Sequence, residues 1–357
     1  MLNKAQISQI KQHLENAQNP IFFFDNDPDG LCSFLILRRY IERGRGVAIK
    51  SFPSLDESYF RKVQELNADY IFILDKPIVS DEFFKKVEEV NIPVVWIDHH
   101  NVSAKIPEFV NYYNPYYKDS ASKLAPYEKD NGSEPVTALC YQVTGKKEDL
   151  WIAVIGCVAD SYLPDFYPEF CKEYSDLAVE ATTPFDVLYK SKIGEISRIL
   201  SNGLKDTTTN VVSMLKFLIN VKSPYDIFDE NSKNHVLHYR HKQIGKKYKD
   251  LLSKAKKLYG KDRILFFKYS GDLSISGELS NELCYLFPEK IVIVAYIKGM
   301  KANLSLRGKN IREMFLKSIE GVSGATGGGH RDAVGGQMSV GDLDKFTKNL
   351  QDIVDKN

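Results

Sequence analysis

Cysteines are few in this sequence, and no apolar run is long. The five cysteines are scattered and form no CxxC pair, which argues against a disulfide framework and a cysteine zinc site. Cysteines used in this way indicate a reducing compartment and predict a cytoplasmic protein. No apolar run reaches the roughly 18 residues that a membrane-spanning helix needs. The N-terminal stretch is polar and amphipathic, so we do not expect a secretory signal there.

The chain also lacks a net charge of either sign. Its 48 Lys and Arg residues and 47 Asp and Glu residues leave a formal net charge of +1. This balance excludes a uniformly basic coat for nucleic acid, but it allows a locally basic face. Hydrophobic residues make up 43% of the 357 residues, which is enough for a sizeable core. At about 100–200 residues per domain, the length predicts two domains.

Strands and helices are predicted to alternate in the first hundred residues. The run IFFFD at 21–25 is continuously apolar, as in a strand buried on both faces. The elements predicted after it are strands at 46–51, 70–75 and 94–98 and helices at 30–43, 56–67 and 80–90. This alternation predicts an α/β fold with a doubly wound parallel sheet. Ligands bind beyond the carboxyl ends of the strands in such sheets.

Acidic residues gather at those strand ends. The motif DNDPDG at 25–30 places three aspartates at alternate positions after a buried strand, where they repel one another unless cations neutralise them. Mg²⁺ and Mn²⁺ prefer such oxygen ligands. For this motif alone, an Asx-rich turn is the alternative interpretation. The candidate metal ligands along the chain are Asp25, Asp27, Asp29, Asp75, His99 and Asp160.

The later residues of this set differ in how specifically they indicate a metal site. Asp75 alone is typical of a turn or a helix cap. The run Asp98-His99-His100 at a strand exit is more specific, because packing does not explain it, and it predicts one metal ligand and one imidazole facing a substrate. Asp160 ends a predicted helix at 148–160, where the helix dipole disfavours a carboxylate. Together the residues predict a centre of two divalent cations that hydrolyses phosphoesters.

A second predicted domain follows, with strands at 263–267, 290–296 and 302–307, a helix at 276–286 and a closing helix at 342–354. Its glycine-rich loop at 324–340 contains GGGHRDAVGG, whose free N–H groups could cradle an anion at the start of a short helix. A flexible turn is the alternative. The candidate phosphate-binding residues are Arg307, Gly328, Gly329, His330 and Arg331.

A basic segment separates these two parts of the chain. Residues 231–263 contain eleven Lys or Arg residues and two acids, a local charge of +9. Apolar residues at helical spacing predict a long amphipathic helix with a basic outer face. An ordinary solvated face is the alternative. The predicted division is a catalytic domain at 1–190, a helical connector at 191–261 and a substrate-binding domain at 262–357.

The motifs, in this order, resemble those of the DHH phosphoesterase superfamily. DNDPDG, Asp75, IDHH at 97–100 and Asp160 match its acidic motifs, and GGGHRDAVGG resembles the loop of its DHH-associated C-terminal domain. Phe23 stands where pyrophosphatases and nano-RNases carry a histidine. The D-x-D-x-D-G form instead resembles RecJ single-strand exonucleases, especially their compact archaeal relatives. Lys76 departs from the pattern, because a small residue often follows that aspartate in the superfamily.

The resemblance implies two Mn²⁺ ions in the first domain and a substrate phosphate held by the C-terminal loop. By position, His99 would bind metal, His100 would face the scissile phosphate, and Asp98 would orient the histidines. The implied partners are single-stranded DNA or RNA and replication or repair proteins. A nano-RNase or a phosphatase of short or cyclic nucleotides is the first alternative. A non-catalytic replication scaffold is the second, and the complete ligand set disfavours it.

Overall fold

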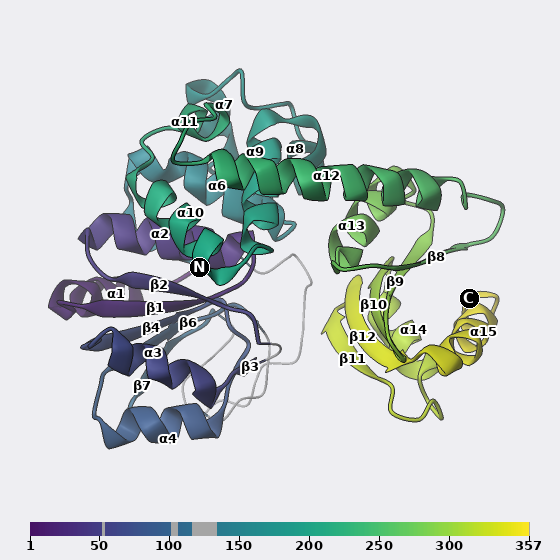
Figure 1. Cartoon of the computed structure of the whole chain (residues 1–357), viewed down its shortest axis with the longest axis horizontal. Coiled ribbons are helices and arrows are strands. Elements are labelled where there is room, and N and C mark those ends of the chain that lie inside the picture. Colours follow the sequence, from purple (N-terminus) through teal and green to yellow (C-terminus); the bar gives the residue numbers. More distant parts are fainter. Residues whose placement is uncertain (52–53, 101–105, 116–133, 357) are drawn as a thin grey trace. The chain divides into compact units, whose positions relative to one another are not determined.

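The computed structural model of the chain describes residues 1–51, 54–100, 106–115 and 134–356 (Figure 1). The chain forms two compact units, Met1–His241 and Lys242–Asn357. The boundaries predicted at 190 and 261 divide the chain by expected function, and they remain predictions. Among the helices of the described part, none is long and apolar enough to cross a membrane.

The first unit is built on a parallel five-stranded sheet in the order β2-β1-β4-β6-β7. Its strands are β1 (Pro20–Asp25), β2 (Arg45–Ile49), β4 (Tyr70–Leu74), β6 (Val94–Ile97) and β7 (Val110–Tyr113), beside a short pair of β3 (Ser54–Leu55) and β5 (Ile78–Val79). The predicted doubly wound α/β fold is therefore confirmed. The sequence did not lead us to expect β7, and the strand expected at 46–51 ends two residues early.

Strand residues alternate between two hydrophobic cores. In β1, Phe22 and Phe24 belong to one core, whereas Ile21 and Phe23 belong to the other. Because successive side chains of a strand point to opposite faces, the continuous apolar run fills both sides of the sheet. Helix α2 lies on one side, and α3 and α4 lie on the other (Figure 1).

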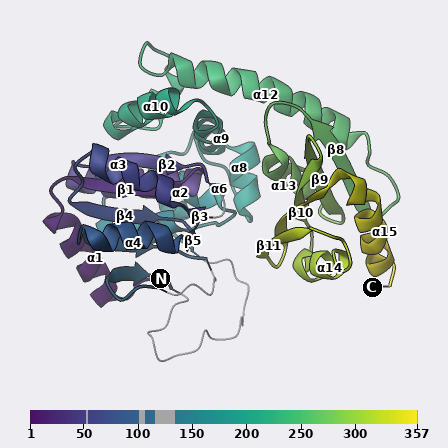
Figure 2. The same cartoon turned by 60° about the horizontal axis from the view of Figure 1, so that its bottom comes forward.

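Helices of the first unit pack mostly on the α2 side, where α2 contacts α5 and α6. The helices of this unit are α1 (Lys4–Asn16), α2 (Pro28–Ile41), α3 (Phe60–Glu65), α4 (Asp81–Glu89), α5 (Val136–Thr144), α6 (Leu150–Ala159), α7 (Tyr167–Glu173), α8 (Pro184–Lys190), α9 (Lys192–Leu204), α10 (Thr208–Asn220) and α11 (Tyr225–Phe228), with 3₁₀ turns at Glu57–Tyr59 and Lys147–Asp149. The helix expected at 56–67 is thus a 3₁₀ turn followed by a short α-helix. Figure 2 shows α3 and α4 beside the strands of this sheet in a second view.

The second unit contains a mixed sheet in the order β11-β12-β10-β9-β8, in which only β8 and β9 are parallel. Its elements are β8 (Ile264–Ser270), α13 (Ser276–Leu286), β9 (Ile291–Lys298), β10 (Lys301–Arg307), α14 (Ile311–Ser318), β11 (Thr326–His330), β12 (Ala333–Ser339), a 3₁₀ turn at Val340–Asp342 and α15 (Leu343–Val354). The glycine-rich segment expected as a loop is therefore a β-hairpin of β11 and β12, and the 3₁₀ turn that follows it begins at Val340. Gly327 allows close approach of the two strands, because a Cβ there would lie 2.5 Å from the carbonyl oxygen of Gly335.

Helix α12 (His235–Lys256) carries the basic segment and belongs to both units. Its apolar stripe serves two cores, because Leu237 packs in the core of the first unit whereas Ile244 and Ala255 pack in the second. Nine lysines of this segment are exposed: Lys233, Lys242, Lys246, Lys247, Lys249, Lys254, Lys256, Lys257 and Lys261. The amphipathic helix with a basic outer face is confirmed, over a shorter range than 231–263.

Candidate metal centre

Three strand ends bring the acidic motifs together. Asp25 is the last residue of β1, Asp75 follows β4, and Asp98 follows β6. Because β1, β4 and β6 are parallel neighbours, their carboxyl ends lie at one edge of the sheet. Asp75 has a left-handed backbone with φ of 60°, a conformation that is costly for most residues but tolerated by aspartate. Such a residue at a buried strand end is typical of a functional turn.

The start of α2 holds the next two aspartates. Asp27 is the N-cap of α2 and accepts a hydrogen bond of 2.9 Å from the N–H of Gly30. Asp29 is buried, and its two carboxylate oxygens accept hydrogen bonds from the N–H groups of Val136 and Thr137 at the start of α5. Glycine is required at position 30, since a Cβ there would lie 2.5 Å from the carbonyl oxygen of Asp25. The turn therefore holds both carboxylates in fixed positions.

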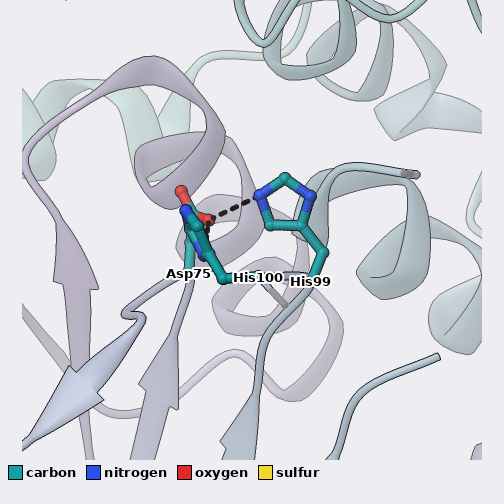
Figure 3. Close-up of side chains that lie close together, drawn as sticks. All are labelled: Asp75, His99 and His100. Atoms are coloured by element: carbon teal, nitrogen blue, oxygen red, sulfur yellow. Dashed lines mark ion pairs between the residues drawn. The ribbon is translucent and has the colours of Figure 1, made fainter. Parts of the chain in front are cut away.

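His99 lies among three of the predicted ligands. Its Nε2 is 3.3 Å from Oδ1 of Asp75 and 3.8 Å from Oδ2 of Asp160, which caps the C-terminus of α6. Figure 3 shows both histidines directed toward Asp75. Within the described residues, Oδ1 of Asp75 is buried and makes no hydrogen bond. A buried carboxylate oxygen that makes no hydrogen bond within the described residues, next to imidazole and carboxylate groups, fits a bound divalent cation.

Two groups of side chains have the spacing of metal ligands. One group is Asp29, His99 and Asp160, and the other is Asp75, His99 and His100; within each, the ligand atoms all lie within 4.8 Å of one another. His99 belongs to both groups. Asp25 and Asp27, although described, belong to neither. The structure thus brings four of the six predicted ligands together, with His99 among them.

His100 is held by an acidic residue and its neighbours. Its Nδ1 is 2.8 Å from Oδ1 of the fully buried Asp98, which also accepts a hydrogen bond from the His100 N–H. Tyr112 and Asn114, at and after β7, donate to Oδ2 of Asp98, and Asn114 also donates to the carbonyl oxygen of His100. The contacts with Asp98 therefore fix the ring orientation of His100, whereas the role predicted for Asp98 in orienting both histidines remains a prediction. Sequence reasoning missed Tyr112 and Asn114 because it missed β7.

The carboxylates of this cluster resist ionisation. Loss of hydration, followed by the negative charge of Asp25, raises the pKa of Asp27 to about 6. The same loss and the charge of Asp27 raise the pKa of Asp29 to about 7. The pKa values of Asp75 and Asp160 are also raised, by lost hydration and by the neighbouring carboxylates. A cation at the centre would favour their charged forms.

His100 shifts in the opposite direction. Burial lowers the pKa of His100, but the hydrogen bond and charge of Asp98, together with Asp160 and Asp25, outweigh burial and raise this pKa to about 9. The acidic groups around His100 therefore favour its protonated form in the metal-free chain. An imidazolium with one nitrogen tied to a buried carboxylate can present its other N–H to an anion.

Lys76 is a residue of the cluster whose role the motifs did not predict. Its side chain is 1% exposed, and its ammonium lies 2.9 Å from Oδ1 of Asp25 and donates to the carbonyl oxygen of Ser51 at 2.9 Å. Trp96 donates from its indole N–H to the carbonyl oxygen of Lys76. The departure from the superfamily pattern after Asp75 could have indicated this role.

The predicted phosphate-binding residues lie in the second unit. Arg307 at the end of β10 is opposite Ala333, which is opposite His330, so these residues share one end of the sheet. Arg307 donates to Asn281, and Arg331 pairs with Asp332 at 3.0 Å. Gly328 has open space on its Cβ side. Gly329 has φ of 143°, which favours glycine, and the side chain of His330 lies outside the described part of the structure.

Residues 21–159 match the N-terminal domain of the DHH family. This part of the chain is a DHH-family domain. The match contains every residue of the cluster described above except Asp160. No curated protein sequence matches the chain.

Solved structures extend the likeness to almost the whole chain. RecJ from Thermus thermophilus in complex with Mn²⁺ is 14% identical at a TM-score of 0.66, over 99% of this chain and 54% of RecJ. An exonuclease RecJ bound to manganese is 15% identical at a TM-score of 0.60, over 99% of this chain and 94% of that protein. The pGpG-specific phosphodiesterase PggH from Vibrio cholerae is 14% identical at 0.51, over 95% and 99%. At these identities the likeness shows the fold, which is RecJ-like, and the chain spans about half the length of the Thermus protein.

Proposed function

We propose that this protein is a metal-dependent phosphodiesterase that removes nucleotides from an end of single-stranded DNA or RNA. The observation that carries this proposal is the convergence of His99, Asp75 and Asp160 beside His100, whose pKa the neighbouring acidic groups raise. Ligands for a hard cation and a fixed imidazolium are together what a phosphodiester needs, because negative charge must be stabilised on its oxygens.

A divalent cation in this centre would be held by Asp29, Asp75, His99 and Asp160. When bound, such an ion lowers the pKa of water and polarises a phosphoryl oxygen. His100 would donate a hydrogen bond from Nε2 to the scissile phosphate, because its Nδ1 is engaged by Asp98. Asp98, with Tyr112 and Asn114, would keep that imidazolium charged and aimed. Mn²⁺ is the expected ion, since the RecJ structures that share the fold contain it, and Mg²⁺ is the alternative.

Single strands are the proposed substrate because of the basic face of α12. Exposed lysines along one helix bind phosphates without reading sequence. In the second unit, Arg307, Arg331 and the hairpin glycines would hold a substrate phosphate, with His330 beside them by sequence. Replication or repair proteins are the proposed protein partners, and the five free cysteines support a cytoplasmic location.

A dinucleotide phosphodiesterase is the second candidate. The observation in its favour is the fold, which the Vibrio enzyme shares over 95% of this chain and 99% of its own length. An enzyme of this kind would need to fit only two nucleotides and would make little use of α12.

Rates on substrates of graded length test both candidates. DNA and RNA strands, each labelled at either end, would be digested with Mn²⁺ or Mg²⁺ beside a dinucleotide and a nucleotide bisphosphate. Faster hydrolysis of the long strand, with mononucleotides released in order from one end, supports the exonuclease. Faster hydrolysis of the dinucleotide supports the second candidate. No hydrolysis of any substrate by a folded, metal-binding protein would contradict both and favour a replication scaffold.

A further inference from the structure

We propose that the ammonium of Lys76 is a built-in cation that removes Asp25 from the ligand set, so that the centre binds one divalent ion and not two. This inference rests on the proposed function, since it concerns the same metal centre. It departs from the expectation of two ions that the acidic motifs raised.

The position of Lys76 carries the proposal. Lysine is almost never fully buried unless it is paired, because an unpaired ammonium loses its hydration without compensation. Here the side chain is 1% exposed and makes two contacts of 2.9 Å, one to Asp25 and one to the carbonyl oxygen of Ser51. The ammonium therefore joins the ends of β1 and β4 to the segment after β2.

Asp25 is engaged by this contact. Its Oδ1 accepts hydrogen bonds from both the Lys76 ammonium and the Asn26 N–H, each at 2.9 Å. A carboxylate oxygen offers about two lone pairs, so both are used on this oxygen. A divalent ion that bound Asp25 would therefore need Oδ2 and would approach a fixed like charge.

The other carboxylates are arranged differently. Asp75 has a buried oxygen that lacks a hydrogen bond within the described residues, and it faces His99. Both groups with the spacing of metal ligands contain His99, and neither contains Asp25. An exchangeable cation is thus expected around His99, whereas the chain itself neutralises Asp25.

The turn after β4 produces this division. The left-handed backbone at Asp75 places its carboxylate next to His99, and the following residue reaches Asp25. The indole of Trp96 holds the carbonyl group of Lys76 from β6. One strand end therefore supplies, in successive residues, a ligand for the ion and an ammonium that contacts Asp25.

Metal stoichiometry of the full chain tests the proposal. Metal-free protein would be titrated with Mn²⁺ by calorimetry, and bound metal would be counted by elemental analysis after desalting. We expect one ion per wild-type chain. Asp25→Asn should keep one ion, with an affinity less than tenfold weaker. Lys76→Met should bind two, because Asp25 becomes free to act as a ligand.

Two ions in the wild type would overturn the inference, as would a tenfold or greater loss of affinity in Asp25→Asn or a single ion in Lys76→Met. If Lys76→Met does not fold by circular dichroism, the wild type and Asp25→Asn still decide. Lys85→Met, which removes an exposed lysine from α4, is the matched control and should bind as the wild type does. A wild type that binds no ion at all would instead contradict the proposed function.

Discussion

Two ends of one acidic cluster contrast in how their charge is balanced. At the Lys76 end, a buried ammonium contacts Asp25 at 2.9 Å. At the His99 end, Asp29, Asp75 and Asp160 surround an imidazole, and a buried oxygen of Asp75 has no hydrogen bond within the described residues. The carboxylates at this edge of the sheet therefore differ in their partners: Asp25 contacts a buried ammonium, whereas the other three lie around His99.

The largest expected effect breaks the His99 end. His99→Ala removes the residue common to both ligand groups. Loss of a residue that only hydrogen-bonds a metal ligand costs roughly 10- to 100-fold in metal affinity or activity. We therefore expect Mn²⁺ affinity and hydrolysis to fall by more than that in His99→Ala. Calorimetry and the end-labelled strand assay would measure both. His235→Ala, at an exposed histidine of α12, is the control. Retention of full metal affinity by His99→Ala would contradict the ligand assignment.

The next prediction separates positioning from metal binding. In Asp98→Asn the pKa of His100 should fall below about 9, because Asp98 supplies the hydrogen bond and charge that raise it. Activity should drop about 10- to 100-fold and its alkaline limit should move to lower pH, while one Mn²⁺ still binds. A pH–rate profile and NMR titration of His100 would show this. Loss of the metal with an unchanged profile would assign Asp98 to the metal centre itself.

Proton competition at the His99 end gives a smaller, pH-dependent effect. The raised pKa values of the candidate ligand Asp29, about 7, and of its neighbour Asp27, about 6, mean that the folded metal-free chain binds protons more tightly than the unfolded chain does. Their contribution to stability is complete below the unfolded pKa of 3.8 and is lost as the pH rises through 6 to 7. The Mn²⁺-induced rise in Tm should therefore be larger at about pH 8 than at about pH 5.5.

Thermal melts in Mn²⁺ and in chelator across that range would test this linkage. The melts in chelator serve as the control, since they report the metal-free chain alone. An equal metal-induced shift at both pH values would show that protons do not compete with the ion for these carboxylates.

The smallest expected effect lies outside the cluster, on the basic face of α12. Lys246→Glu with Lys249→Glu should weaken binding of a single strand and reduce its salt dependence, by about 0.7 in logarithmic slope for each phosphate that is no longer neutralised. Fluorescence anisotropy over a salt series would measure the slope. Lys317→Glu with Lys348→Glu changes the same charge at exposed lysines elsewhere in the second unit. Equal slopes in the two double variants would assign α12 to an ordinary solvated face.

Much of the fold was predictable because its signals are local. The run at 21–25 is apolar without a break, so a doubly buried strand followed directly from the sequence. The strand β7, VNYY, is short and mixed in polarity, and it was missed together with Tyr112 and Asn114. The glycine-rich hairpin was expected as a loop, because glycine is depleted in strands and nothing in the sequence indicated the pairing between β11 and β12.

The sequence by itself determined which residues are candidates for the chemistry: an aspartate after each of three buried strands and a pair of histidines beside one of them. Parallel strands must bring such residues to one edge, so their convergence was a consequence of pattern alone. Only the tertiary structure decided how those carboxylates divide. The pairing of Lys76 with Asp25 depends on side chains 51 positions apart and on burial, and neither spacing nor composition encodes a contact of that range.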